Sequence, residues 1–278
     1  MDSAMEWLEV PALSDPLALV AFEGWNDAGD AASGAVEYLR TATDARLIGI
    51  VDHDDFNDHQ VTRPHVTTTD SGERTIDWPD TRLYVANAGG RDLVLVIGEE
   101  PRMQWKRFCR LLSGSLKEAE ANTVITFGAF LGQVPHTLEV PVIGSYDVET
   151  RRAYDLLPSR YEGPTGIIGV LNQWLKKDGF DAGSLWAASP HYLQSTTNPK
   201  AARALLAKAQ TLGGFELAMD ELDVEVAEWE ARVAAAVSDN DELAGYLREM
   251  EEVLAEAIDD DDDDTNLVEE IERFLRNQ

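Results

Sequence analysis

The turn at residues 22–32, Phe-Glu-Gly-Trp-Asn-Asp-Ala-Gly-Asp-Ala-Ala, constrains the fold most strongly. An apolar run over 17–22 stops abruptly at this turn, and a helix-like run of small residues follows it. This order predicts a strand, a polar turn and a helix start within about fifteen residues. In an open α/β sheet such a turn lies at the carboxyl end of a strand, where ligands bind. We therefore expect either the entrance to a site or a well-capped junction here.

Strand and helix patterns alternate along the first three quarters of the chain. Strands are expected at 17–22, 47–51, 83–86, 93–97, 123–127, 140–143 and 184–188, with short strands in 61–80. Helices are expected at 28–40, 104–121, 165–175 and 199–212. A hairpin around Gly89-Gly90 makes the sheet mixed. The alternation predicts a three-layer α/β/α domain with a largely parallel sheet, which we place at residues 1–212.

Residues 213–278 are expected to form an acidic helical subdomain, because they contain no strand pattern. Two apolar stripes at helical spacing run along it, formed by Leu222, Trp229, Val233 and Val237 and by Leu243, Leu247, Met250, Leu254 and Ile258. Asp239-Asn240-Asp241 predicts a turn and a helix cap between them. Six aspartates at 259–264 predict a solvated linker before a short helix that carries Leu267, Ile271, Phe274 and Leu275. Stripes of this kind often pack onto a neighbouring subunit.

Charge and composition limit the classes of molecule that this protein is expected to bind. The net charge of −29 argues against nucleic acid, because such a surface repels phosphate backbones. No apolar run reaches the roughly 20 residues that span a bilayer, so we expect no membrane partner. The single cysteine, Cys109, cannot form an internal disulfide, and residues 1–10 contain acidic but no basic side chains. We therefore expect a cytoplasmic protein without a secretory signal.

The opening turn supplies the first candidate residues, Glu23, Trp25, Asn26 and Asp27. Asp27 lies where a helix N-cap belongs, and Asp30 favours the positive end of the helix dipole. Capping and close packing of small residues explain most of the turn. They leave Trp25 and Asn26 unexplained, and this pair is expected to be exposed to a ligand or partner.

Three later turns supply the other candidates. His136 and Thr137 follow the strand that is expected to end at Gly128. Thr165 precedes an apolar helix, where it acts as an N-cap or helps to form an anion cradle. His191 and Tyr192 follow the strand at 184–188, which places them at the same sheet edge as Trp25 and His136. The alternative for His191 is a buried histidine with its hydrogen bonds satisfied.

Several familiar chemistries are missing from these turns. The opening turn has neither the Gly-Lys-Ser/Thr of a phosphate loop nor the glycine spacing of a dinucleotide site. No serine lies in a Gly-x-Ser-x-Gly elbow, and Cys109 lies in an apolar helix, where it serves packing. The cluster His53, Asp54, Asp55, Asp58 and His59 matches no metal-ligand spacing. We therefore predict no catalytic residue, metal or cofactor.

Five motifs occur in order over residues 15–210. They are Glu23–Ala32, Arg63-Pro64, Pro135-His136-Thr137, Pro190-His191-Tyr192-Leu193 and Asn198-Pro199-Lys200-Ala201-Ala202. Together they resemble the proteasome assembly chaperone family in its bacterial, actinobacterial branch. The resemblance implies a three-layer fold similar to nucleoside phosphorylases and peptidyl-tRNA hydrolases. It also implies that the protein forms a homo-oligomer, namely a trimer. Its partners are then expected among proteasome subunits or other protein clients. The resemblance brings no established catalytic residues.

Two positions depart from this family pattern. Many bacterial members continue Pro-His-Thr with Arg, whereas Leu138 follows here, so a pocket that relies on that guanidinium is altered. Proteasome-docking tails carry a tyrosine near the end, whereas this sequence ends Phe-Leu-Arg-Asn-Gln. Direct insertion of the tail into proteasome pockets is therefore not expected.

Two functions stay open from the sequence. The first is a non-enzymatic binding or assembly module that resembles proteasome assembly chaperones. The alternative is a hydrolase or phosphorylase for a nucleoside- or glycoside-like small molecule, and it rests on fold analogy alone. In that alternative Glu23 or Asp27 acts as acid or base, and Asn26 with His136 or His191 orients the substrate.

Overall fold

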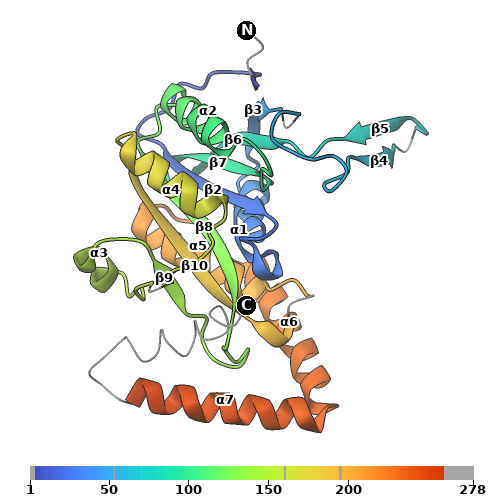
Figure 1. The fold of residues 1–278 in the computed structure, drawn as a ribbon, viewed down its shortest axis with the longest axis vertical. Coiled ribbons are helices and arrows are strands. Elements are labelled where there is room, and N and C mark those ends of the chain that lie inside the picture. The colour runs from blue at the N-terminus through green and yellow to red at the C-terminus, as the bar shows by residue number, and fades with distance from the viewer. Residues whose placement is uncertain (1–3, 53, 70, 160, 194–195, 260–278) are drawn as a thin grey trace.

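The structure is a computed structural model that describes residues 4–259 apart from 53, 70, 160 and 194–195, with side chains described as far as 254. A mixed sheet of eight strands crosses the molecule in the order β1-β3-β6-β7-β2-β8-β10-β9 (Figure 1). The strands are β1 Met5–Trp7, β2 Leu17–Glu23, β3 Arg46–Val51, β6 Thr81–Ala88, β7 Arg91–Glu99, β8 Thr123–Gly132, β9 Val142–Gly144 and β10 Asp181–Pro190. The central strands β7, β2, β8 and β10 are parallel, and the remaining pairs are antiparallel.

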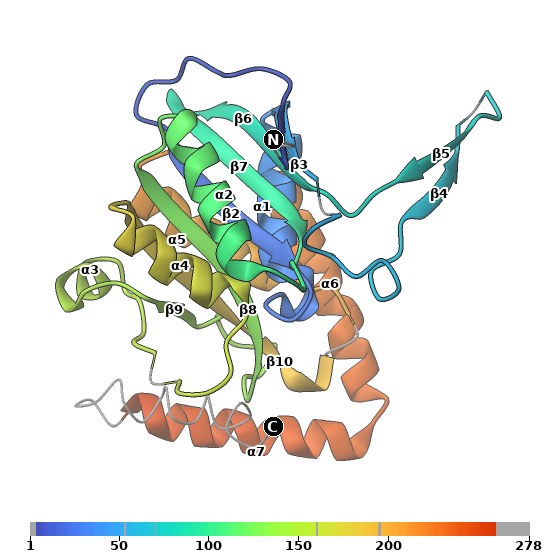
Figure 2. The same ribbon diagram turned by 45° about the horizontal axis from the view of Figure 1, so that its top comes forward.

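Helices cover both faces of the sheet. The helices α1 Ala31–Ala42 and α5 Pro199–Gly213 lie on one face, and α2 Trp105–Glu118 and α4 Ile167–Lys177 lie on the other (Figure 2). Strand β2 is buried on both faces: Leu17, Leu19 and Ala21 pack with α1 and α5, and the alternate residues pack with α2 and α4. A strand that alternates between two covered faces reads as a continuous apolar run. The predicted three-layer α/β/α fold is confirmed.

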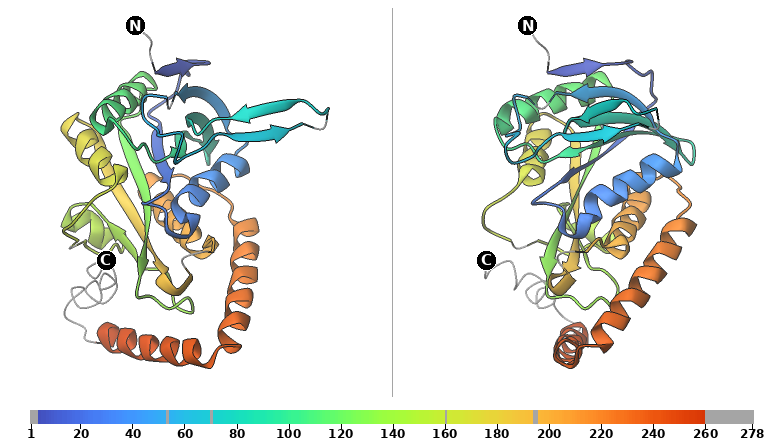
Figure 3. Two further views of the ribbon diagram at one scale, coloured as in Figure 1. Left: turned by 45° about the vertical axis from the view of Figure 1, so that its right-hand side comes forward. Right: turned by 90° about the vertical axis from the view of Figure 1, so that its right-hand side faces the viewer.

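The β4–β5 hairpin stands away from this body. Strands β4 His65–Thr68 and β5 Arg74–Asp77 form their own two-stranded sheet (Figures 1 and 3). The remaining short elements are η1 Ala28–Asp30, α3 Val148–Ala153 and η2 His191–Leu193. Neither β1 nor α3 was expected from the sequence, because each is too short to carry a periodic pattern. Strand β8 continues five residues past the expected end at Phe127, since its last residues pair with β10.

Two long helices follow the sheet domain, and we call them the arm: α6 Asp220–Ser238 and α7 Asp241–Asp259 (Figure 3). The first predicted stripe is buried at Leu222, Trp229, Val233 and Val237, and the second is buried at Leu247, Met250 and Leu254. They pack on the same chain: Met250 and Leu254 contact Val134 and Ala188 near the ends of β8 and β10. The Asn240 side chain accepts a hydrogen bond from the Leu243 amide, which confirms the predicted cap.

The division into residues 1–212 and 213–278 stays a prediction. Phe215 and Leu222, which follow the predicted boundary, belong to the same hydrophobic core as residues of α1 and α5. The short helix predicted after the aspartate run lies outside the described residues. Among the helices that the structure describes, none has the length and hydropathy that crossing a membrane requires.

Candidate functional site

The opening turn is fixed by backbone hydrogen bonds to two distant elements. The Ala129 amide of β8 donates to the Asn26 carbonyl at 2.7 Å, and the Asn198 amide before α5 donates to the Gly29 carbonyl at 2.7 Å. Gly24 and Gly29 have φ angles of 107° and 68°, a region that favours glycine. The turn is therefore a rigid junction between β2, β8 and α5.

Asp27 is not the N-cap residue of α1, because the short turn η1 intervenes, but its carboxylate accepts hydrogen bonds from the first turn of that helix. One carboxylate oxygen accepts hydrogen bonds from the Ala32 and Ser33 amides at 2.6 and 3.2 Å, and the other accepts from the Ser33 hydroxyl. Burial raises the pKa of Asp27 from 3.8 to about 6, although the Ser33 hydrogen bonds oppose that shift. Asp30 lies at the N-cap position of α1.

Trp25 and Asn26 do not form the exposed pair that the sequence suggests. The Trp25 side chain is 60% exposed, whereas Asn26 is fully buried. The Asn26 amide nitrogen donates to Glu100 Oε1 at 2.7 Å, and the Ile167 amide at the start of α4 donates to the same oxygen at 2.9 Å. Asn26 therefore joins the turn to α4 through the carboxylate of Glu100, which no sequence motif indicates.

Thr165 does not cap α4. The N-cap residue is Gly166, which makes no side-chain cap, and Glu100 supplies the acceptor from another part of the chain. A side chain at position 166 would collide with the Asn26 amide, so a glycine is required at this junction. The predicted N-cap role of Thr165 is wrong because a carboxylate distant in sequence occupies that role.

A pocket of about 710 Å³ opens between the turn, α4 and strands β8 to β10. Its walls include Trp25, Asp27, Tyr161, Thr165, Asn172 and Trp186. Three of the predicted candidates, Trp25, Asp27 and Thr165, thus meet in one pocket. Sequence reasoning missed Asn172 and Trp186, which lie on a helix and a strand without a local motif.

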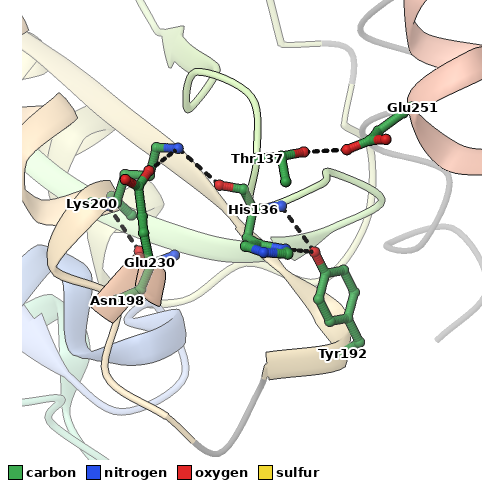
Figure 4. Close-up of polar contacts among 8 residues, drawn as sticks. His136, Thr137, Tyr192, Asn198, Lys200, Glu230 and Glu251 are labelled. Atoms are coloured by element: carbon green, nitrogen blue, oxygen red, sulfur yellow. Dashed lines mark hydrogen bonds and ion pairs between the residues drawn. The ribbon is translucent and has the colours of Figure 1, made fainter. Parts of the chain in front are cut away.

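His136, Thr137 and Tyr192 lie apart from this pocket, beside the arm (Figure 4), and so does His191, which contacts Tyr246 of α7. The Tyr192 hydroxyl lies 2.8 Å from His136 Nδ1 and accepts from the His136 amide at 2.9 Å. Burial, and then the nearby Lys200 ammonium, lower the pKa of His136. His191 Nδ1 lies 3.2 Å from the Gly132 carbonyl, and its Nε2 lies 3.3 Å from the Tyr246 hydroxyl of α7.

The same cluster holds both helices of the arm. Lys200 donates to the His136 carbonyl at 2.8 Å and forms an ion pair of 2.6 Å with Glu230 of α6. The Thr137 hydroxyl donates to Glu251 of α7 (Figure 4). These four predicted residues brace the arm and do not line the pocket.

Glu23 also lies outside the pocket, beside Glu99 on the neighbouring strand β7. Both line a hollow of about 300 Å³ at the base of the hairpin, together with Arg63 and Trp78. Burial, followed by repulsion from the Glu99 carboxylate, raises the pKa of Glu23 from 4.5 to about 7.

Replacing Glu99 by Gln should flatten the pH dependence of stability. Folded Glu23 keeps its proton up to about pH 7, whereas the unfolded carboxyl loses it near 4.5, so the free energy of unfolding falls as pH rises between these values. Allowing for solvent screening, this fall amounts to about 1 kcal/mol, and Glu99→Gln should remove about half of it.

Urea unfolding at pH 5 and pH 8 measures this difference. Glu139→Gln provides the matched control, because Glu139 is exposed and its loss should leave the Glu23 contribution unchanged. An identical pH dependence in Glu99→Gln and the parent protein would contradict the coupling of the two carboxyls.

Neither the cysteine nor the histidine–aspartate loop adds a reactive centre. Cys109 is buried in α2, and burial raises the pKa of its thiol to about 12, which confirms its packing role. His59 Nε2 pairs with Asp54 at 3.1 Å. Within residues 4–259 apart from 53, 70, 160 and 194–195, no three His, Cys, Asp or Glu side chains are grouped to hold a metal.

Known proteins show where this architecture occurs. The crystal structure of a PAC2 family protein from Streptomyces avermitilis resembles this structure with a TM-score of 0.77. The two sequences are 44% identical, and the match covers 84% of this chain and 99% of that chain. The Mycobacterium tuberculosis proteasome-assembly chaperone homologue Rv2125 is 38% identical, with a TM-score of 0.76 over 83% and 99% of the two chains.

A third structure follows the fold further. The Mycobacterium tuberculosis unknown function protein Rv2714 is 26% identical and has a TM-score of 0.84 over 93% of this chain and 91% of that chain. No curated protein matches the chain significantly. The model of the PAC2 family matches residues 21–237, which include the opening turn, the pocket and most of α6. With this match and the two closely similar actinobacterial structures, the chain belongs to the PAC2 family.

Proposed function

We propose that this protein is a non-enzymatic, cytoplasmic assembly module that resembles proteasome assembly chaperones. It acts as a homo-oligomer of three chains. Its clients are protein chains such as proteasome subunits. The 38% identical relative whose name is proteasome-assembly chaperone homologue supports this class of client. None of the three relatives carries an enzyme name, and the alternative of a hydrolase or phosphorylase rests on the fold alone.

The observation that carries self-association is the apolar face of the β4–β5 hairpin. Val66 and Ile76 are cross-strand partners, which places them on one face, and they are 54% and 55% exposed. Trp78 continues that face with 44% exposure. A two-stranded hairpin is marginally stable alone, so a partner surface over these residues would stabilise it.

Charge favours a second copy of this chain as the partner of the hairpin. The sequence from 61 to 77 contains two arginines and three acidic residues and has a net charge of −1, within a chain of net charge −29. Two strongly acidic copies repel each other least where their charge is lowest. The hairpin combines this low charge with exposed apolar side chains, and it is therefore the place where the copies meet.

Replacing Ile76 by Lys should lower the molar mass measured by light scattering to that of one chain. The added charge cannot be buried at the interface without a partner. Thr75→Lys is the matched control, because residue 75 lies on the opposite face of the same strand and should leave the mass unchanged. An oligomer that survives Ile76→Lys would exclude the hairpin as the contact.

Clients are identified by purifying the tagged protein from its native cell. Co-purification of proteasome subunits, lost when the oligomer is disrupted, is the expected result. Purification of the intact oligomer without any proteasome subunit would contradict the proposed client class and leave the self-association result standing.

A further inference from the structure

The pocket beside the opening turn has no role in the assembly function proposed above. Its volume of about 710 Å³ lies within the range of small-molecule sites. Indole rings from Trp25 and Trp186 and the phenol ring of Tyr161 line it. Trp25 is 60% exposed in a turn that hydrogen bonds fix in place. A large exposed ring on a fixed backbone at a pocket wall is suited to stacking on a flat ligand.

The polar groups of the pocket are mostly uncharged. Asn172 is 4% exposed, and its amide nitrogen finds no hydrogen-bond partner within the described part of the chain. A buried amide without a partner costs free energy that a ligand acceptor would recover. Uncharged side chains also make up most of the surrounding polar wall, namely Ser145, Tyr161, Thr165, Gln173, Ser184 and Thr197.

The charged groups argue against an ionic ligand. Asp27 and Asp30 line the pocket and would repel a phosphate or carboxylate. Asp27 already accepts hydrogen bonds from the start of α1. Lys176 also lines the pocket and donates to the Ser145 carbonyl at 3.2 Å, and its positive charge disfavours a cation. A ligand that suits both kinds of charge is neutral.

We propose that this pocket binds an uncharged ring compound that bears hydroxyl groups, of the nucleoside or sugar class. The ring stacks on an indole of the pocket, and ring or hydroxyl oxygens accept from Asn172. Nucleosides and sugars share this chemistry, and a stacked base alone contributes enough to change affinity by about tenfold or more. The proposal concerns binding and does not depend on the assembly function.

Isothermal titration calorimetry of the full-length protein tests the proposal. Adenosine and uridine are the nucleoside probes, and ribose, glucose and maltose are the sugar probes, so the experiment distinguishes the two classes of ligand. Binding of a nucleoside or of a sugar is the expected result. Adenosine monophosphate serves as the charged comparison and should bind at least about tenfold more weakly than adenosine. The proposal would be overturned if none of the neutral probes released or absorbed heat at millimolar concentration. It would also be overturned if adenosine monophosphate bound more tightly than adenosine.

Two pairs of measurements tie binding to this pocket. Trp25→Ala should weaken the probe that binds by about tenfold or more, whereas Trp7→Ala, at a tryptophan of β1 that does not line the pocket, should not. Asn172→Leu should also weaken binding about tenfold, yet leave thermal stability unchanged or raised, because it removes an unpaired buried amide. Equal effects of the two tryptophan changes, or unchanged affinity in Asn172→Leu, would place the ligand elsewhere.

Discussion

Replacing Trp229 by Ala is expected to lower the free energy of unfolding by about 3–5 kcal/mol, the usual cost of truncating a buried tryptophan. Trp229 is 3% exposed and forms a core with Val233, Val237 and Leu247, against which Tyr192 also packs. Its ring lies edge-to-face with His136 at a centroid distance of 6.4 Å. The cavity would therefore open where the two arm helices meet the sheet domain.

Chemical denaturation gives the total loss, and hydrogen exchange shows where it falls. Amides of α6 and of residues 241–254 should lose protection before those of the central strands. Val224→Ala is the matched control, since Val224 lies on α6 and is 60% exposed. Trp229→Phe should cost less than Trp229→Ala, because the indole nitrogen has no hydrogen-bond partner among the described residues. Unchanged protection of the arm in Trp229→Ala would show that other contacts hold it.

Replacing Glu100 by Ala should cost about 3 kcal/mol or more, because one carboxylate oxygen accepts two hydrogen bonds and each charged bond contributes about 1.5–3 kcal/mol. The change leaves the fully buried Asn26 amide nitrogen and the Ile167 amide without this acceptor. It loosens the opening turn and the start of α4 together, although they are far apart in sequence.

Urea unfolding and exchange of the first amides of α4 measure this effect. Glu100→Gln retains an acceptor oxygen and should lose about 1 kcal/mol, which separates the hydrogen bonds from the charge. Glu99→Ala, at the adjacent position, should cost less because it also relieves repulsion on Glu23. Equal losses at positions 99 and 100 would show that Glu100 does not connect the turn to the helix.

The sequence predicted those features that depend on local patterns. The apolar run of β2 and the stripes of α6 and α7 follow from burial, which imposes a period on the residues of each element. The contact of Asp27 with the start of α1 was predictable only in part: its donors are near in sequence, but they lie five and six residues away because η1 separates Asp27 from the N-cap position. The family was identified from short motifs in turns, and the match over residues 21–237 confirms it.

The candidate site was harder to predict because its contacts are distant in sequence. Asn26 is buried by Glu100 and Gly166, and neither position carries a local signal for that contact. His136 follows a strand, as Trp25 does, yet the arm covers it and its ring meets Trp229. Periodicity shows that the arm helices have a buried side, but it does not identify the surface they cover.

The position of β2 within the sheet has a consequence for synthesis on the ribosome. This second strand of the chain lies between β7 and β8, so one of its edges finds no partner until Thr123–Gly132 has been made. At 5–20 residues per second, the apolar strand waits on the order of 5–20 s after its own synthesis. The central sheet therefore cannot form before about half of the 278 residues have been made, and until then one edge of this apolar strand is unpaired on the nascent chain.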